Sequence, residues 1–384
     1  MALIEHTKYG LYCPPAKVYI DPWRKVDNAL ITHGHSDHAR WGHKYYVCAS
    51  TSVNILKHRL GHDINIRGLD WGEVLSVNGV KFSFHPAGHI TGSAQIRIEY
   101  NGEVWVSTGD YKIEDDGLCT PYEPVSCHHF ITECTFGLPV YKWSPQEQVI
   151  DDIKSWWATN AAEGRPSVLT AYSLGKAQRI IHSVGTDIGP IYTHGAVEKM
   201  NEVYRASGIQ LPPTAHLSKN IDKAQLKKAL IITPGSAVGT TWLSKAKGYS
   251  LGVASGWMAI RGNRRRRGAD RGFVLSDHCD WDGLNQAIKA TGASHIYPTH
   301  GNTVTFSKWL NEQGYRARPI ETEYGDEQDD EIAVLSGDAQ DNQSEDAQYN
   351  HSSVAQYNHS RDAQYNQSGD AEHNQSGATQ DNEN

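Results

Sequence analysis

The stretch ALITHGHSDHARWGH, residues 29–43, decides how this chain folds and where its chemistry lies. An apolar segment of strand composition runs directly into His33, His35, Asp37 and His38. Residues two apart in an extended backbone can point to one side, so His33 and His35 can hold one metal ion. Asp37 and His38, at the start of an expected helix, can face a second ion. Three histidines and one aspartate within six residues thus predict a metal centre for Zn²⁺, with Mn²⁺ and Fe²⁺ as alternatives.

Two later stretches supply further ligands for a site with two ions. FHPAGHITGSAQ places His89 in a glycine-flanked turn between two expected strands, and VWVSTGDYK places Asp110 at the C-terminal end of an apolar strand. That end is where layered α/β folds usually hold functional groups. Taken alone, either residue has an ordinary structural explanation, but beside the first cluster both are predicted to bind metal.

Length and composition predict a soluble, cytoplasmic protein. At roughly 150 residues per domain, the 384 residues suggest about two to three domains. The six cysteines form no C-x-x-C pair, which favours reduced thiols over a disulfide framework or a zinc finger. The sequence shows neither a signal peptide nor an apolar run of roughly 18–20 residues, so we expect no membrane partner.

The C-terminal part differs from the body in charge and composition. Residues 326–384 carry 14 Asp or Glu and one Arg, whereas residues 1–325 carry 35 Lys or Arg against 30 Asp or Glu. From Ala339 the sequence repeats an octapeptide such as AQYNQSGD, whose apolar surface is too small to offset the entropy of ordering. We expect a disordered tail at 326–384, and the mildly basic body permits a polyanionic substrate.

Alternating patterns predict one α/β structure with a second α/β unit inserted at roughly 140–260. Short apolar stretches separated by turn residues make residues 15–110 strand-rich. After Pro145 a helical stretch precedes a buried strand, and a loop then opens a second helix. The expected elements include helices at 146–164 and 281–292 and strands at 167–172, 229–233, 272–276 and 294–299.

These residues resemble the metallo-β-lactamase superfamily. Residues 33–38 match its H-x-H-x-D-H motif in full, His89 and Asp110 look like its third and fourth metal motifs, and Asp21 looks like the supporting aspartate of its first. The resemblance implies an αββα sandwich that holds two Zn²⁺ ions, or Mn²⁺ in their place.

Three later residues look like the extra motifs of the β-CASP nucleases, the nucleic-acid branch of that superfamily. They are Glu133 in FITECTFG, His278 in VLSDHCDW and His300 in IYPTHGN. In that branch an α/β domain is inserted between the first two of these motifs. The resemblance therefore implies a metallo-β-lactamase domain in two parts, 1–140 and 263–325, around a β-CASP domain at 141–262, with the tail at 326–384.

The resemblance also gives each residue a role. The first ion is expected on His33, His35 and His89 and the second on Asp37, His38 and His300, with Asp110 bridging both. Two neighbouring ions generate hydroxide at neutral pH and neutralise charge on the phosphoryl oxygens. His278 is the expected proton donor to the leaving oxygen, oriented by Glu133. Asp37, Asp110, Glu133 and His278 thus form the expected catalytic set, while a loop-capping role for Glu133 and a ligand role for His278 stay open.

Within that branch, the sequence looks most like the bacterial ligase-associated DNA exonucleases. KYGLYCP, PAGHITGSAQ, TFGLPVYKW and RRRRGADRGFVLSDHCDW look like stretches of that group, and the similarity covers about residues 5–322. It implies a DNA substrate, a role in DNA repair, and functional association with DNA ligase and helicase. Asp277 departs from the RNA endonucleases of the branch, which commonly have a small residue there.

Basic residues are candidates for holding the strand. In TAYSLGKAQRI a strand leads through a glycine-containing loop into a helix, so Lys176 at the helix N-terminus is predicted to contact a phosphate. The run before the His278 motif favours contacts with the phosphate backbone over a merely solvated surface. Its predicted substrate-binding residues are Arg264, Arg265, Arg266 and Arg267.

Aromatic residues are divided between the cleft and the core. Tyr9, Tyr12 and Trp143 lie in the resembling stretches and are expected to border the cleft, where rings can stack on bases. Trp156 and Trp157 lie on a predicted helix and are expected in the core.

The leading hypothesis is a zinc-dependent DNA exonuclease that uses two metal ions. An RNA-processing nuclease, of the 3′-end-processing or ribonuclease J type, is the alternative with the same chemistry, and His300 favours it. A non-catalytic β-CASP scaffold is the third hypothesis, which the complete set of proposed ligands disfavours.

Overall fold

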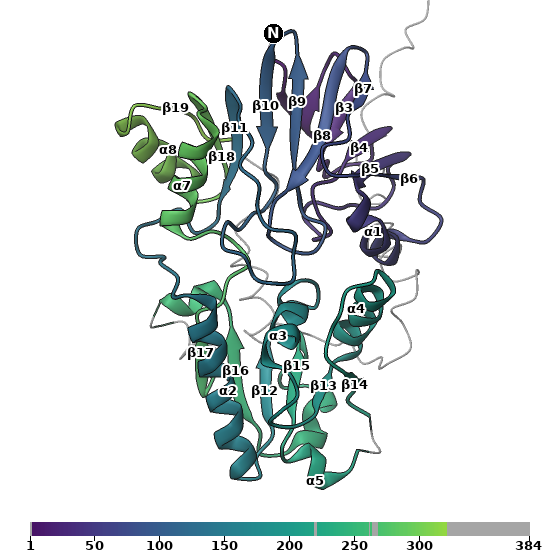
Figure 1. The fold of residues 1–384 in the computed structure, drawn as a ribbon, viewed down its shortest axis with the longest axis vertical. Coiled ribbons are helices and arrows are strands. Elements are labelled where there is room, and N and C mark those ends of the chain that lie inside the picture. The colour runs from purple at the N-terminus through teal and green to yellow at the C-terminus, as the bar shows by residue number, and fades with distance from the viewer. Residues whose placement is uncertain (1, 219–220, 261, 263–267, 321–384) are drawn as a thin grey trace, which may run out of the picture. The chain divides into compact units, whose positions relative to one another are not determined.

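The computed structural model describes residues 2–218, 221–260, 262 and 268–320, whose strands form three sheets (Figure 1). In the first sheet β1 to β3 are antiparallel, and β3 to β6 are parallel. Its strands are β1 (Glu5–Thr7), β2 (Gly10–Cys13), β3 (Val18–Ile20), β4 (Asn28–Leu30), β5 (Tyr45–Ala49) and β6 (Ile66–Leu69). The histidine-rich loop leaves this sheet between β4 and β5.

The second sheet joins segments that are distant in the sequence, in the order β19-β18-β11-β10-β9-β8-β7. Its strands are β7 (Leu75–Val77), β8 (Val80–Pro86), β9 (Ala94–Tyr100), β10 (Glu103–Ser107), β11 (His129–Cys134), β18 (His295–Gly301) and β19 (Arg316–Ala317). β18 pairs in parallel with β11, with His295 opposite His129. The chain therefore returns to this sheet after it has built the third one.

Alternation along the strands gives these two sheets a shared core, and helices pack against part of each outer face. Ile20 and Phe82 belong to the core between the sheets. Tyr46 packs on the other face of the first sheet with residues of α1, and Phe130 packs on the other face of the second with residues of α7 and α8. These helices are α1 (Val53–Leu60), α7 (Trp281–Thr291) and α8 (Thr303–Glu312).

The third sheet is wholly parallel, in the order β14-β13-β15-β12-β16-β17. Its strands are β12 (Ser167–Thr170), β13 (Ile191–Thr193), β14 (Thr214–His216), β15 (Leu230–Thr233), β16 (Ser250–Ala254) and β17 (Arg271–Phe273). Helices α2 (Gln146–Ala162), α3 (Lys176–Val184), α4 (Gly195–Ala206) and α5 (Lys223–Leu226) accompany it, and short 3-10 helices are η1 (Ser50–Ser52), η2 (Gly235–Ala237), η3 (Thr241–Ala246) and η4 (Gly256–Ala259). Both faces are apolar, because Leu169 packs in one core and Val168 in another.

The α/β class and most of the expected elements are confirmed. Helices α2 and α7 and strands β12, β15 and β18 lie where the sequence predicts them. The strand expected at 272–276 is shorter, and as β17 it pairs with β16, so the third sheet extends past the predicted domain boundary at residue 262. Trp157 is fully buried, as expected, whereas Trp156 is half-buried at the edge of the same core.

Two predicted features fall on parts of the chain that are not described. The repeat tail at 326–384 and the arginines at 264–267 both lie outside the described residues. Within the described ranges, every helix is too short or too polar to span a lipid bilayer.

Candidate metal centre

The first cluster brings together side chains from three different loops. His33, His35, His89 and Asp110 each place one ligand atom within 4.8 Å of the others. Nδ1 of His35 lies 3.2 Å from Nε2 of His33 and 3.0 Å from Nε2 of His89. Ligand atoms of a tetrahedral zinc ion, each about 2.0–2.1 Å from the metal, are roughly 3.3 Å apart. The observed spacing therefore suits a single small cation.

The second cluster contains Asp37, His38 and His300, again with one ligand atom each within 4.8 Å. Nε2 of His38 lies 3.3 Å from Oδ2 of Asp37, and the rings of His38 and His300 stack with centroids 5.2 Å apart. His300 has a φ of 51°, a conformation that residues other than glycine rarely adopt. Strained backbone of this kind tends to occur at functional sites.

Asp110 connects the two clusters with a single carboxylate. Oδ2 lies 3.3 Å from Nε2 of His33, whereas Oδ1 lies 3.3 Å from Nε2 of His38. The residue before it, Gly109, has a φ of 55°, and a Cβ there would lie 2.5 Å from Oγ1 of Thr32. The glycine thus lets the Asp110 loop approach the strand end that carries the histidines.

The outward-facing ring nitrogens of the histidines are held by hydrogen bonds. His35 Nε2 donates to the carbonyl oxygen of Leu174 at 3.1 Å, and His89 Nδ1 donates to that of Asp277 at 2.9 Å. His38 Nδ1 donates to Oδ2 of Asp21 at 2.8 Å, while His33 Nδ1 lies 3.1 Å from Oγ1 of Thr32. Of these four partners, the sequence predicted only Asp21. Backbone carbonyls leave no sequence signal, although Thr32 directly precedes the first histidine.

These hydrogen bonds decide which nitrogen of each neutral ring carries the lone pair. A carbonyl oxygen can only accept, so the opposite nitrogen of neutral His35 and His89 is the unprotonated one. Unprotonated nitrogens of His35 and His89 therefore face each other at 3.0 Å with no proton to share. In addition, Nε2 of His38 is buried and makes no hydrogen bond within the described part of the chain. Both observations fit a bound cation, so these residues are suited to hold a metal ion.

The electrostatics favour the metal-binding protonation states. Burial and the neighbouring His38 lower the pKa of His33 to about 4, against the opposing effect of Asp110. Burial also lowers the pKa of His89 well below its ordinary value. For Asp110 burial acts in the opposite direction, but the nearby His38 and His33 outweigh it and lower its pKa. Neutral imidazoles and an ionised carboxylate are the forms that bind a metal ion.

The second cluster also favours positive charge, as the pKa of His38 shows. Burial disfavours its protonated form, but Asp110 and Asp37 outweigh burial and raise the pKa of His38 well above its ordinary value. The second cluster thus attracts a cation strongly enough to hold a proton in a buried ring, and a metal ion would replace that proton.

Glu133 and His278 form a buried pair next to the first cluster. Glu133 lies at the end of β11, and its Oε1 accepts hydrogen bonds from Nδ1 of His278 at 2.8 Å and from the backbone N–H of Tyr111 at 3.0 Å. The His278 ring centroid lies 4.6 Å from that of His89. Glu133, His278 and Asp110 each place one atom within 4.8 Å of the others, so the pair adjoins the bridging carboxylate.

No family model matches the chain. Its relatives include proteins whose names refer to nucleic-acid enzymes. A protein named as a probable DNA ligase of Opitutus terrae is 28% identical over 335 residues, which are 86% of this chain and 32% of that protein. The RNase J-like protein of Methanocaldococcus jannaschii is 25% identical over 218 residues, 47% of this chain and 50% of that protein. Endoribonuclease YSH1 of Saccharomyces cerevisiae is 31% identical over 198 residues, 41% of this chain and 25% of that protein.

The chain is a relative of the metallo-β-lactamase/β-CASP nucleases. It spans between a quarter and a half of the length of these relatives. A crystal structure of a protein of unknown function from Enterococcus faecalis has a TM-score of 0.53 at 12% identity, covering 78% of this chain and 80% of that one. That likeness shows the fold alone.

In this β-CASP relative, a buried ion-pair network links the third sheet's helices to the metal centre. Arg179 of α3 is 1% exposed, and its Nη1 donates to Oδ1 of Asp277 at 2.9 Å and to the carbonyl oxygen of Ser276 at 2.8 Å. Asp277 in turn accepts from His89 through its backbone and directly precedes His278. Burial raises the pKa of Asp277, but Lys176 and Arg179 outweigh it and lower that pKa. Arg179 is not among the residues that the sequence pattern indicated, although it lies one helical turn after Lys176.

Two residues that the sequence placed near the substrate, Lys176 and Trp143, lie beside this network. Nζ of Lys176 is 3.7 Å from Oδ2 of Asp277 and 4.7 Å from the centroid of the Tyr172 ring, and the side chain is buried. Its contact with a phosphate stays a prediction. Trp143 donates from Nε1 to the carbonyl oxygen of His278 at 3.0 Å, which places it beside the expected proton donor.

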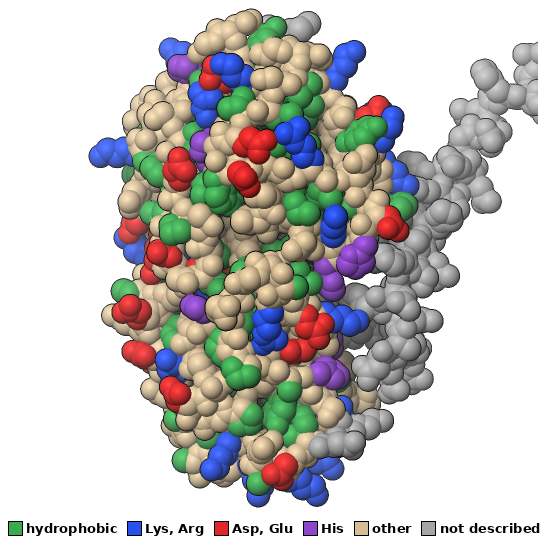
Figure 2. All heavy atoms as spheres, turned by 45° about the vertical axis from the view of Figure 1, so that its right-hand side comes forward, with side chains coloured by type: hydrophobic (Ala, Val, Ile, Leu, Met, Phe, Trp, Pro, Cys, Tyr) green, Lys and Arg blue, Asp and Glu red, His purple; other side chains and the backbone are tan. Residues whose placement is uncertain are grey.

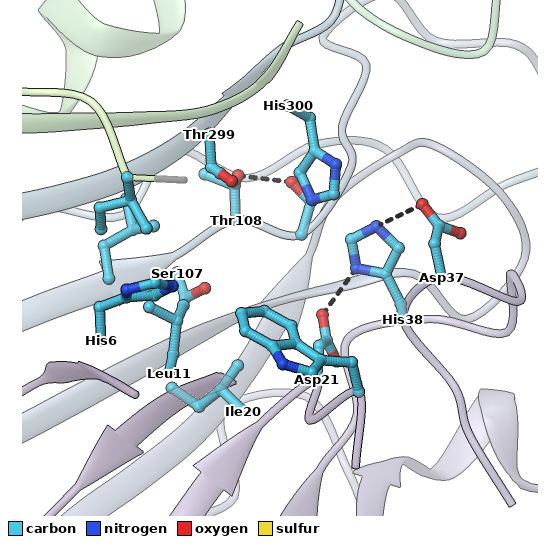
Figure 3. Close-up of a pocket in the computed structure, with 14 residues that line it drawn as sticks. His6, Leu11, Ile20, Asp21, Asp37, His38, Ser107, Thr108, Thr299 and His300 are labelled. Atoms are coloured by element: carbon cyan, nitrogen blue, oxygen red, sulfur yellow. Dashed lines mark hydrogen bonds and ion pairs between the residues drawn. The ribbon is translucent and has the colours of Figure 1, made fainter. Parts of the chain in front are cut away.

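A cavity between the first two sheets opens beside the second cluster (Figure 3). Asp37, His38 and His300 line one part of it, and Leu11 and Ile20 line another. Figure 3 shows His38 between Asp21 and Asp37, joined to both by dashed lines. Apolar walls next to the ligands keep the local dielectric low, which strengthens each charge interaction there.

Asp110→Asn should reduce metal binding at both clusters, because the amide replaces the one carboxylate that both share. We expect the bound metal, measured by mass spectrometry after dialysis, to fall from about two ions per chain to one or fewer. His85→Ala, which changes a histidine outside the clusters, is the control and should retain about two ions. Full metal content in the Asp110 variant would contradict the bridging role.

Asp277→Ala should destabilise the protein, because the buried Arg179 loses its carboxylate partner at 2.9 Å and keeps only the more distant Asp116 carboxylate at 3.7 Å among the described residues. Removing one partner of a buried pair costs about 3–5 kcal/mol, which lowers Tm by roughly 10 °C in a protein of this size. Combining it with Arg179→Met should lower Tm by less than the sum of the single effects, as measured by calorimetry of the metal-loaded protein.

The exposed pair Arg67–Glu73, with 3.0 Å between Nη2 and Oε1, provides the matched control. Arg67→Met should shift Tm by only about 2 °C or less, since exposed pairs contribute about 0–1 kcal/mol. Simple addition of the two Tm shifts at Arg179 and Asp277 would show that the pair does not act as a unit.

Proposed function

We propose that this chain hydrolyses phosphodiester bonds of DNA as a zinc-dependent exonuclease, with Mn²⁺ as an alternative metal, and that it acts in DNA repair. The observation that carries the proposal is the Asp110 carboxylate, whose two oxygens face two separate ligand clusters. Two-metal sites of this kind are built for displacement at phosphorus. The proposal includes the fold, an αββα sandwich with an inserted β-CASP domain.

The chain's own residues would hold the ions and orient the substrate. His33, His35 and His89 would hold one ion, and Asp37, His38 and His300 the other, with Asp110 between them. Bound there, the two ions would supply hydroxide at neutral pH and neutralise charge on the phosphoryl oxygens. Asp21 and the carbonyls of Leu174 and Asp277 fix the rings, so the ligand atoms need no reorganisation.

His278 is positioned to protonate the leaving oxygen. Because Nδ1 donates to Oε1 of Glu133 at 2.8 Å, the proton for the leaving oxygen would come from Nε2. The Glu133 carboxylate stabilises the protonated ring, and the N–H of Tyr111 holds that carboxylate in place at 3.0 Å. No serine or cysteine nucleophile is needed in this scheme.

The choice of DNA rests on resemblance, and RNA is the alternative. The relative from Opitutus terrae is named a probable DNA ligase, which supports association with DNA ligase and, by family resemblance, helicase. The names RNase J-like protein and endoribonuclease YSH1, together with His300, support an RNA-processing nuclease. A non-catalytic scaffold is less well supported, because every predicted ligand is present in a cluster. The predicted cytoplasmic location remains part of the proposal.

One assay tests this proposal. The metal-loaded protein is incubated with DNA and RNA strands of one sequence, labelled at the 5′ end or the 3′ end, with Zn²⁺ or Mn²⁺. Stepwise loss of single nucleotides from DNA is the expected result. Faster turnover of RNA would favour the RNA-processing alternative, and no cleavage of either polymer would favour the scaffold.

His278→Ala should lower kcat by about 10²–10⁴-fold while both metal ions remain bound, since general acid catalysis contributes about that much. Glu133→Gln should lower kcat less, because the amide still holds the ring but no longer stabilises its charge. Single-turnover kinetics and metal analysis of the same samples give both quantities. Loss of one metal ion in the His278 variant would identify this residue as a ligand instead.

A further inference from the structure

The outer face of the first sheet carries a groove of tyrosines and lysines that the proposed mechanism does not use. Tyr9, Tyr12 and Tyr19 line it together with Lys17, Lys25 and Lys44, and we call it the tyrosine–lysine groove. It lies on β2 and β3, on the turn before each of them, and on the loops that follow β3 and precede β5. Tyr9 and Tyr12 belong to the KYGLYCP stretch that the sequence analysis singled out.

Strand alternation explains why the rings face solvent. Leu11 and Ile20 are opposite each other on β2 and β3 and line the cavity between the sheets. Their neighbours Tyr12 and Tyr19, also a cross-strand pair, must therefore point to the outer face. The Tyr12 and Tyr19 ring centroids are 4.5 Å apart, and Tyr9 lies 6.0 Å from Tyr19, so the three rings form one half-buried aromatic surface.

The charge of the groove is positive and is not neutralised by neighbours. Lys17, Lys25 and Lys44 are exposed, and Asp27 is the one carboxylate that lines the groove. Among the described residues, no carboxylate forms an ion pair with any of the three lysines. Figure 2 shows one face of the molecule, on which acidic and basic side chains are interspersed.

Two exposed aromatic residues lie beside lysines of this groove. Trp41 is 50% exposed and Tyr45 is 43% exposed, which is unusual for side chains of this size. Nζ of Lys25 lies 5.1 Å from the Trp41 ring centroid, and Nζ of Lys44 lies 5.4 Å from that of Tyr45. Trp41 follows the ligand His38 by three residues, so the surface is continuous in sequence with the second cluster.

The loop that presents these groups is held in a fixed position. The backbone N–H of Lys44 donates to the carbonyl oxygen of Val26 at 3.1 Å, and that of Tyr45 donates to Asp27 at 2.9 Å. The N–H of Val26 donates to Nδ1 of His43 at 3.3 Å. Bonds in both directions between residues 26–27 and 43–45 set the spacing of the lysines before any ligand arrives, which reduces the entropy lost on binding.

We propose that the tyrosine–lysine groove binds a single-stranded segment of the nucleic acid whose end is cleaved at the metal centre. This inference rests on the proposed nuclease function. Bases stack on exposed aromatic rings regardless of sequence, and lysines beside the rings contact the phosphates between the bases. Protein interfaces are typically depleted in lysine, so the composition favours a polyanion over a protein partner.

The first test removes the positive charge. The full-length, metal-loaded variant Lys17→Gln/Lys25→Gln/Lys44→Gln is compared with wild type on single strands of about 6 and about 30 nucleotides. For the long strand we expect KM to rise about tenfold or more with kcat unchanged, and for the short strand neither to change. The slope of log Kd against log salt, from fluorescence anisotropy with the long strand, should become shallower by about 2.

The matched control is Lys223→Gln/Lys227→Gln/Lys228→Gln, which removes the same charge from exposed lysines at and just after α5. It should leave KM for the long strand and the salt slope at wild-type values. Equal effects of the two triple variants would reduce the groove to general electrostatics and overturn the proposal. A groove variant with wild-type KM and salt slope would overturn it as well, and would leave a protein partner as the occupant to test.

The second test separates stacking from charge. Tyr12→Leu/Tyr19→Leu should weaken binding of the long strand about tenfold or more, since each stacked base contributes about 1–3 kcal/mol, whereas Tyr12→Phe/Tyr19→Phe should bind normally. Equal binding by the Leu and Phe variants would exclude stacking. If wild type binds the long strand through the groove but cleaves nothing, the proposed function fails while the groove assignment stands. If wild type cleaves the short and the long strand and the groove variants behave like wild type, the groove assignment fails while the proposed function stands.

Discussion

The buried carboxylate of Asp110 is the constraint on which the rest of the structure depends. It is 3% exposed and contacts His33 through one oxygen and His38 through the other. A buried charge is tolerated only when it is paired, so the loops after β4 and β10 must meet at this carboxylate. The close packing of Gly109 against Thr32 is part of the same requirement. The two clusters thus share the side chain of Asp110.

The segment around the third sheet takes part in the metal centre and is more than an appended unit. Leu174, in the loop before α3, accepts a hydrogen bond from His35, and Arg179 holds Asp277, whose carbonyl orients His89. Two of the three rings of the first cluster therefore depend on residues that the inserted segment contributes or restrains. A change in the packing of α3 would be transmitted to the ligand atoms without altering any ligand.

Local sequence patterns predicted most helices and strands correctly. They did not predict which strands pair when those strands are distant in the sequence. The apolar periodicity of residues 146–164 and 281–292 identified α2 and α7, because helix formation depends on nearby residues. The position of β17 was harder, since GFVLS is an equally good strand for either sheet, and only its pairing with β16 shows which sheet contains it. The pairing of β18 with β11 likewise joins strands that lie on either side of the whole inserted segment, with His129 opposite His295.

The sequence by itself determined the chemistry: which histidines and carboxylates are available, and that seven of them suit two metal ions. Ligand identity is a property of side chains, and side chains are written in the sequence. Only the tertiary structure decided that the carbonyls of Leu174 and Asp277 orient the rings, that Arg179 is buried against Asp277, and that Tyr12 and Tyr19 face outward. The direction of a carbonyl and the exposure of a ring depend on how distant segments pack, and no local pattern specifies that packing.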